Sequence, residues 1–262
     1  MRILLTNDDG IYSDGLRHLV NALSPVAELY IVAPDREKSA TGHAITLHKP
    51  LRVEKIRIPG TKAEGWKTNG TPADCVVLGI QGIMRSKPDL VVTGINAGPN
   101  LGEDLTYSGT VSGAMEGTLF DLPAFAVSVA AYTDIEFSAA ALLASNLAQQ
   151  LNAGLRLPIG TFLNVNLPNI LATAIKGIRL TSQGRRRYED RLEKRVDPRG
   201  RVYFWLGGNL LETDMPPETD GWAVKNGYVS ITPIHMNLTD YTALHSLKGW
   251  DIGSLLGKQT EG

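Results

Sequence analysis

The sequence is poor in cysteine and lacks long apolar runs. Cys75 is its only cysteine, which excludes a disulfide within the chain and a cysteine-rich zinc site. It lies in an apolar stretch, residues 75–78, so we expect a buried structural thiol. No apolar run reaches the roughly 18–20 residues of a membrane span, and residues 1–5 are too few for a secretory signal. We therefore expect a protein of a reducing, cytoplasmic compartment with no membrane partner.

An excess of charge of either sign is also missing. The chain has 26 basic and 27 acidic side chains among 262 residues, for a net charge of −1. This balance argues against a protein that binds duplex nucleic acid or lies on a membrane surface. Hydrophobic residues make up 43% of the sequence, too many for a disordered chain and enough for one large α/β domain.

Strand-like and helix-like segments alternate through the first 170 residues. Short apolar runs typical of buried parallel strands occur at residues 2–6, 28–33, 90–95, 124–130 and 162–167. Helical signals occur at residues 16–23, 73–84, 108–120 and 136–151. The alternation predicts a Rossmann-like α/β fold, with a mostly parallel sheet and helices on both faces. Ligands of such sheets bind beyond the carboxyl ends of the strands.

The sequence changes character after residue 170. Residues 185–201 hold eight basic and four acidic side chains, with a turn signal at residues 197–200 between two predicted hairpin strands. A solvated β-arm or subunit contact is the favoured interpretation, and a basic arm facing the substrate is the alternative. A last strand is predicted at residues 228–232 and a helix at residues 241–247. We expect a catalytic core, residues 1–170, packed as one domain with a C-terminal β-rich arm and oligomerisation region, residues 171–262.

Oxygen-bearing side chains follow three of the predicted strands. Asp8 and Asp9 come after the first strand, Ser39 lies in the loop after the second, and Asn96 follows a central one. Burying two adjacent carboxylates without a partner costs several kcal/mol, so a divalent cation between them would explain the pair. The alternative is a surface Asp-Gly turn. Carboxylate, hydroxyl and amide oxygens suit Mg²⁺ or Mn²⁺ better than Zn²⁺.

Two further segments suit the binding of an anion. Residues 93–102 contain three glycines, a proline and two asparagines, which let the backbone approach a ligand closely, yet they form neither a dinucleotide fingerprint nor a P-loop. Ser108, Gly109 and Thr110 open a predicted helix, where free N–H groups and the helix dipole attract an anion. A simple Ser or Thr cap is the alternative there. Together with the oxygen ligands, these segments predict a metal-assisted phosphoryl hydrolase.

The segments 3–10, 32–36, 94–102, 107–111 and 227–233 closely resemble the SurE family in order and spacing. The resemblance covers nearly the whole chain and its motifs are specific. It implies a metal-dependent nucleoside 5′-monophosphate phosphohydrolase (5′-nucleotidase), a family in which some members also act on 3′-nucleotides or polyphosphate. It also implies a homodimer or homotetramer that exchanges C-terminal elements.

Residue roles follow from the resemblance, position by position. It implies one Mg²⁺ or Mn²⁺ per subunit, held by four ligands: Asp8, Asp9, Ser39 and Asn96. It also implies that Asp8 and Asp9 are catalytic. It implies that the substrate is bound by Asn100, Ser108, Gly109 and Thr110. We expect the Thr110 hydroxyl to face the phosphate without being needed by the cation. The sequence leaves open which aspartate orients the attacking water.

Two alternatives remain at this point. A haloacid-dehalogenase-like phosphatase uses an aspartate nucleophile and a second acid two residues later, but Gly10 occupies the place of that acid. A non-catalytic nucleotide sensor on the same fold is the alternative from another class. Phosphate release from a nucleoside monophosphate, with and without EDTA, distinguishes both from a metal-dependent nucleotidase.

Overall fold

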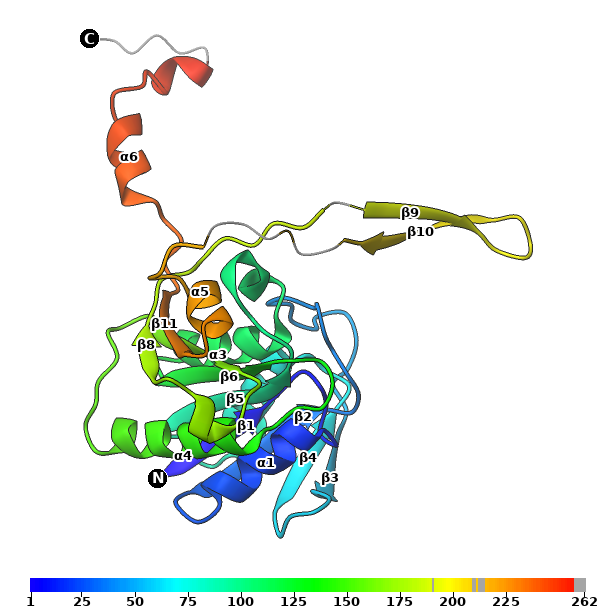
Figure 1. Cartoon of the computed structure of the whole chain (residues 1–262), viewed down its shortest axis with the longest axis vertical. Helices are drawn as coiled ribbons and strands as arrows, with labels where there is room; N and C mark the ends of the chain where they lie inside the picture. The colour runs from blue at the N-terminus through cyan, green and yellow to red at the C-terminus, as the bar shows by residue number, and fades with distance from the viewer. Residues whose placement is uncertain (190, 209–210, 212–214, 257–262) are drawn as a thin grey trace.

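The computed structural model describes residues 1–189, 191–208, 211 and 215–256 (Figure 1). A nine-stranded sheet forms the centre of this described part. In spatial order its strands are β3 (Val53–Arg57), β4 (Glu64–Thr68), β2 (Glu28–Pro34), β1 (Arg2–Thr6), β5 (Leu90–Ala97), β6 (Ala124–Ala130), β7 (Thr161–Pro168), β11 (Val229–His235) and β8 (Ile178–Leu180). All neighbouring strands pair in parallel except β3 with β4 and β11 with β7. The mostly parallel sheet predicted from the sequence is confirmed.

Helices cover both faces of the sheet, as predicted. Helices α1 (Asp14–Leu23) and α4 (Ser138–Asn152) pack on one face, and α2 (Pro72–Leu78) and α3 (Gly109–Leu119) pack on the other. Successive residues of β1 point to opposite faces, so Ile3 and Leu5 join the first core and Leu4 joins the second. Cys75 is fully buried in the second core, and this burial raises the pKa of its thiol, as expected for a structural cysteine.

One predicted helix has a different ending. The segment 73–84 begins as α2, where Thr71 and Asp74 form a capping box, but after Leu78 it continues as a π-helical turn, Gly79–Ile83. Gly79 lies against the sheet, since a Cβ there would come within 2.5 Å of the Leu4 side chain. The close approach of this helix to β1 therefore depends on a residue without a side chain.

Several short elements were not predicted. Strands β3 and β4 extend the sheet at one edge, and β8 and helix α5 (Asp220–Lys225) add to the other side. The described residues also form three 3₁₀ turns: η2 (Gly102–Thr106), η3 (Ala172–Ala174) and η4 (Gly253–Leu256). Since β8 and β11 both lie after residue 170, the C-terminal region contributes strands to the central sheet as well as an arm.

The arm is a hairpin that projects from the body of the molecule (Figure 1). Its strands β9 (Arg191–Val196) and β10 (Val202–Gly207) pair antiparallel, and the predicted turn between them is closed by Asp197, which accepts the N–H groups of Arg199 and Arg201. Helix α6 (Tyr241–Leu247) also lies away from the sheet (Figure 1). The last six residues of the predicted C-terminal region, 257–262, lie outside the described residues. Among the described helices, none has the length and apolar character required to cross a membrane.

Candidate active site

The candidate site lies where the carboxyl ends of β1 and β5 meet the start of α3. Strands β1 and β5 are parallel neighbours, so Asp8 and Asp9, just after β1, lie beside the end of β5. Asn96 is the next-to-last residue of β5, beyond a shift in the β5–β6 register between Thr93 and Asn96. The topology thus brings together residues about 90 positions apart in sequence, as the location of ligand sites in parallel sheets predicts.

Asp8 is held almost entirely inside the protein. It is 3% exposed, and its carboxylate accepts hydrogen bonds from the hydroxyl and the N–H of Thr110 at the start of α3. Gly109 makes this contact possible, because a Cβ at that position would lie 2.7 Å from the Asp8 Cβ. Burial raises the pKa of Asp8, and the Thr110 hydrogen bonds oppose that rise.

Asp9 has a different environment and a more clearly shifted pKa. One carboxylate oxygen accepts the Ala97 N–H at 3.1 Å, which ties Asp9 to the end of β5. Burial, and then repulsion from Asp8, raise the pKa of Asp9 to about 7, and Glu37 adds a smaller repulsion. Within the described part of the chain, no ion pair joins either aspartate to a cationic side chain. The pair is therefore a concentration of negative charge without a protein counter-ion.

The two neutral oxygen donors belong to segments that are hydrogen-bonded to this pair, through the N–H of Ala97 to Asp9 and the N–H of Lys38 to the Asp8 carbonyl. Asn96 is 9% exposed, and its amide nitrogen donates to the Gly98 carbonyl at 2.9 Å, which fixes the plane of the side-chain amide. Ser39 is exposed and donates to Glu37 at 2.7 Å. The residue before it, Lys38, donates its N–H to the Asp8 carbonyl at 2.7 Å, so the Ser39 loop is attached directly to the aspartate segment.

This donor set fits a hard divalent cation. Two carboxylates with raised pKa values, Asp8 buried and Asp9 partly buried, and without a counter-ion among the described residues gain most from a bound positive charge. An amide and a hydroxyl beside them complete an all-oxygen set of the kind that Mg²⁺ and Mn²⁺ prefer. Among the described residues, no group of three or more His, Cys, Asp or Glu side chains is arranged to hold a metal ion. A metal ion at this place would need neutral oxygen ligands in addition to the two carboxylates.

The segment predicted to bind phosphate begins α3, but the hydroxyl groups of Ser108 and Thr110 form hydrogen bonds within the protein. Ser108 is the N-cap, and its side chain accepts the Val111 N–H at 3.0 Å. The Thr110 hydroxyl donates to Asp8, so the expectation that it faces only the phosphate does not match the structure. The reason is the close approach of α3 to β1 at Gly109, which brings Thr110 within reach of the carboxylate.

Asn100 is built into a buried network of asparagines. Its carbonyl accepts the side-chain amides of Asn164 and Asn166, at 2.8 and 3.0 Å. Its own N–H donates to Asn166 at 2.8 Å, and its side-chain amide donates to Ser128 at 2.7 Å. Sequence reasoning missed Asn164 and Asn166, although two asparagines alternating within the apolar strand β7 were a visible signal. The network fixes the backbone of the loop that follows β5.

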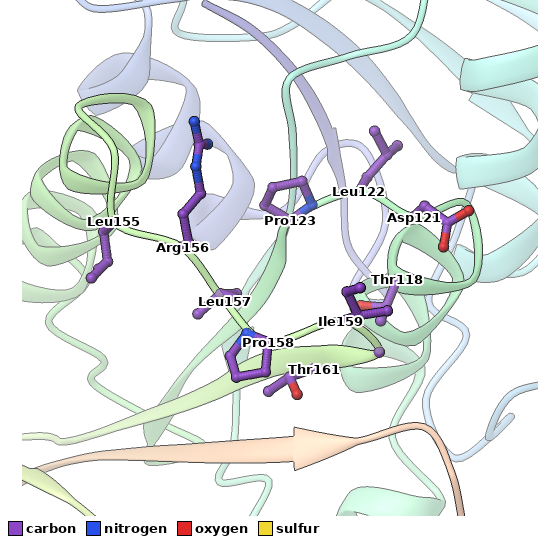
Figure 2. A pocket seen from close by; sticks show the side chains of 11 residues that line it. Thr118, Asp121, Leu122, Pro123, Leu155, Arg156, Leu157, Pro158, Ile159 and Thr161 are labelled. Atoms are coloured by element: carbon purple, nitrogen blue, oxygen red, sulfur yellow. The ribbon is translucent and has the colours of Figure 1, made fainter.

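The hollow shown in Figure 2 is not part of this site. It has a volume of about 300 Å³ and is lined by residues 118, 121–123 and 155–161. Pro123 precedes β6 and Thr161 begins β7, so the hollow lies at the amino ends of these strands. The carboxylates lie at the opposite edge of the sheet.

A mostly parallel sheet with helices on both faces, and an aspartate pair at its carboxyl edge beside a helix N-terminus, define a Rossmann-like α/β protein. The family described as Survival protein SurE matches residues 3–190, and the chain belongs to this family. A relative from Pelotomaculum thermopropionicum, named 5′-nucleotidase SurE, is 51% identical over 95% of this chain and 94% of its own length. Another of the same name, from Desulforamulus reducens, is 49% identical over 95% and 98%. The crystal structure of the Sure protein from Aquifex aeolicus has a TM-score of 0.83 and 43% identity, and covers 98% of this chain and 100% of that one.

Proposed function

We propose that this protein is a metal-dependent 5′-nucleotidase that hydrolyses nucleoside 5′-monophosphates to nucleoside and phosphate. The observation that carries the proposal is the pair formed by buried Asp8 and partly buried Asp9, which has no cationic partner among the described residues and in which Asp8 contacts the start of α3. The names of the relatives, 5′-nucleotidase SurE, support the same activity. They do not favour the alternative of a non-catalytic nucleotide sensor.

The metal would be held by four residues: Asp8, Asp9, Ser39 and Asn96. A divalent cation in this place supplies stabilisation for charge on the phosphoryl oxygens and acidity for a water molecule. Thr110 keeps Asp8 oriented through its hydroxyl and N–H. Ala97 does the same for Asp9 through its N–H. We assign Mg²⁺ or Mn²⁺, one per subunit, from the all-oxygen character of the donors.

The substrate phosphate would lie at the start of α3, beside the aspartates. The N–H of Gly109, at the first position of the helix, is the donor that we assign to a phosphoryl oxygen, together with the positive end of the helix dipole. Ser108 contributes as the cap that fixes the helix start, and Asn100 holds the adjacent loop. Preorganised donors of this kind stabilise charge that develops in the transition state.

Phosphate release from AMP, measured with added Mn²⁺ or with EDTA, tests the activity. We expect release only with the metal, and 3′-AMP and tripolyphosphate in the same assay test the side activities implied by the resemblance. Binding of AMP without any release would instead support the nucleotide sensor. A HAD-like enzyme would trap phosphate on an aspartate during turnover, which mass spectrometry of the quenched enzyme detects.

We also infer a homodimer or homotetramer that exchanges C-terminal elements. The hairpin exposes large apolar side chains, among them Trp205 at 58% and Leu206 at 90%, and Leu238 and Trp250 are exposed at 87% and 67% in the C-terminal segment. Exposed apolar groups on a projecting arm favour burial against a second copy. Light scattering at micromolar concentration should show no 28 kDa species, and a clean monomer would contradict this assignment. The cytoplasmic location and the division at residue 170 stay predictions.

A further inference from the structure

An exposed aromatic ring lies directly on the loop that carries the site. Tyr132 follows β6 and is 77% exposed, yet its ring is in contact with Gly98. A Cβ at Gly98 would lie 2.8 Å from the Tyr132 Cε1 atom, and Gly98 has a φ of +130°, so this position needs glycine for both reasons. The ring is thus seated on the backbone, with most of its surface open to solvent.

The turn under Tyr132 is the same turn that holds two predicted metal ligands. The Gly98 carbonyl accepts the side-chain amide of Asn96 at 2.9 Å, and the N–H of Ala97 donates to Asp9 at 3.1 Å. Tyr132 is therefore separated from these ligands by one short turn of backbone. An exposed ring that is one short turn of backbone away from the proposed phosphate site is well placed to contact the part of a substrate outside its phosphate.

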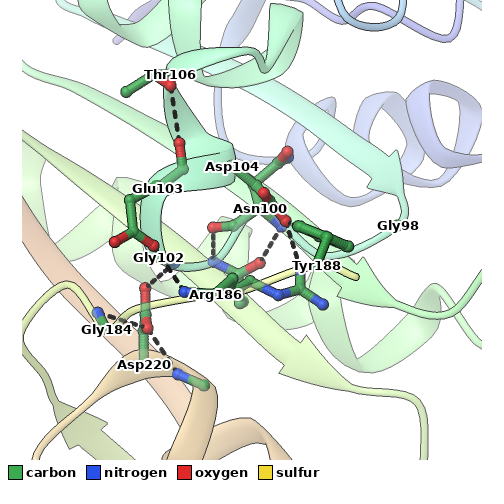
Figure 3. A network of polar contacts seen from close by, with 12 residues as sticks. Gly98, Asn100, Gly102, Glu103, Asp104, Thr106, Gly184, Arg186, Tyr188 and Asp220 are labelled. Carbon is green, nitrogen blue, oxygen red and sulfur yellow. Dashed lines mark hydrogen bonds and ion pairs between the residues drawn. The ribbon is translucent and has the colours of Figure 1, made fainter. Parts of the chain in front are cut away.

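A second aromatic group stands beside this loop. Burial, a hydrogen bond to Asp104 and, to a smaller extent, the neighbouring Tyr132 phenol raise the pKa of Tyr188 to about 12. The Tyr188 hydroxyl donates to the Asp104 carboxylate, which also forms an ion pair with Arg186 at 2.8 Å (Figure 3). The Arg186 guanidinium lies 5.8 Å from the centre of the Tyr188 ring. Aromatic and guanidinium planes are the groups on which nucleobases stack.

Backbone hydrogen bonds hold the segment that leads to Arg186 and Tyr188 against the site loop. The Asp220 carboxylate accepts the N–H groups of Gly102 and Gly184, each at 2.9 Å, and so joins the site loop to the base of the arm (Figure 3). The Arg186 N–H adds a hydrogen bond of 2.6 Å to Glu103. Groups fixed in this way lose little conformational entropy on binding.

We propose that Tyr132 stacks on the base of the substrate nucleotide, with Tyr188 and Arg186 completing an aromatic and cationic rim outside the phosphate site. This inference rests on the proposed nucleotidase function and specifies how the nucleoside part is recognised. Stacking uses the face that every base has, so the rim accepts all bases and favours the larger purines. Tyr132 determines preference for nucleotides over other phosphate esters and takes no part in the chemical step.

The test compares AMP with ribose 5-phosphate, which has the same sugar and phosphate but no base. For Tyr132→Ala we expect kcat/KM for AMP to fall about 5- to 150-fold, the range expected for loss of one base–aromatic stack. The value for ribose 5-phosphate should not change. Tyr132→Phe, which keeps the ring, should retain wild-type values for both. Tyr30→Ala, near the amino end of β2, is the control at the opposite edge of the sheet.

Binding of adenosine to the EDTA-treated protein gives a second measurement that needs neither metal nor turnover. Calorimetry should show weaker binding to Tyr132→Ala than to the wild type and to Tyr132→Phe. Equal losses for AMP and ribose 5-phosphate, or unchanged adenosine binding, would overturn the stacking role. If the wild-type protein releases no phosphate from AMP, the nucleotidase proposal fails, and the adenosine measurement still decides for or against the stack.

Discussion

Replacing Thr110 with valine removes one hydroxyl at the centre of the candidate site. Valine keeps the size and the β-branch, and Thr110 is fully buried, so the helix start should stay in place. The lost group is the donor to the Asp8 carboxylate. A hydrogen bond to a charged group contributes about 1.5–3 kcal/mol, so the charged form of Asp8 should be destabilised by that amount. The pKa of Asp8, already raised by burial, rises further.

Both metal affinity and turnover should follow the loss of this hydrogen bond. A cation binds the ionised carboxylate, so Mn²⁺ affinity should fall by about 10- to 150-fold, and kcat/KM for AMP by at least as much. The sequence alone gave the opposite expectation for the metal, because it placed the hydroxyl against the phosphate. Calorimetry with Mn²⁺ and steady-state kinetics on one preparation measure both quantities.

The same helix offers a matched control. Thr118 is 6% exposed, and its hydroxyl donates to the Ala114 carbonyl within α3, at 3.0 Å. Thr118→Val therefore removes a buried hydroxyl from this helix without touching the site, and it should bind Mn²⁺ as the wild type does. Wild-type Mn²⁺ affinity in Thr110→Val, or an equal loss in Thr118→Val, would refute the role of Thr110 in orienting Asp8.

Three further predictions concern the same carboxylates. Asp8→Asn or Asp9→Asn should lower the rate of AMP hydrolysis by roughly 10³-fold or more with the fold intact by circular dichroism, and near-normal rates would exclude the ligand assignment. Gly109→Ala should weaken Mn²⁺ binding in calorimetry, because its Cβ would lie 2.7 Å from the Asp8 Cβ, whereas Gly82→Ala, with no atom within 4 Å, should not. Because the metal-free pKa of Asp9 is about 7, Mn²⁺ affinity should decrease as the pH is lowered through 7 and level off above it. A pH-independent affinity between 5 and 8 would contradict that environment for Asp9.

Much of the fold could be predicted because its strands are buried on both faces. The apolar run at residues 2–6 and the helix start at Ser108 correspond to β1 and to the N-cap of α3. Strand β3 was missed because it is an exposed edge strand with charged residues and no apolar run. Strand β8 was missed because three residues form no detectable pattern.

The sequence predicted which segments meet at the candidate site but not the contacts between their side chains. Oxygen-bearing side chains after the strands pointed to Asp8, Asp9 and Asn96, since the parallel topology determines where strand ends meet. The contact between Thr110 and Asp8 depends on how closely the start of α3 approaches the segment after β1, which no local pattern reports. The sequence did not point to Tyr132 either, because its contact with Gly98 joins two loops that are 34 residues apart in the sequence.

The folded protein holds the two carboxylates of the candidate site in electrostatically unfavourable positions. Burial raises the pKa of Asp8 and of Asp9, and repulsion from Asp8 raises the pKa of Asp9 further. Hydrogen bonds from neighbouring elements oppose this rise, from Thr110 of α3 for Asp8 and from Ala97 of β5 for Asp9. A raised pKa in the folded state means that ionising these groups opposes folding, and for Asp9 this opposition grows as the pH rises from about 4 towards 7. A bound cation offsets the same charge. The folded core therefore stabilises an arrangement that is electrostatically unfavourable by itself and that a bound cation would make favourable.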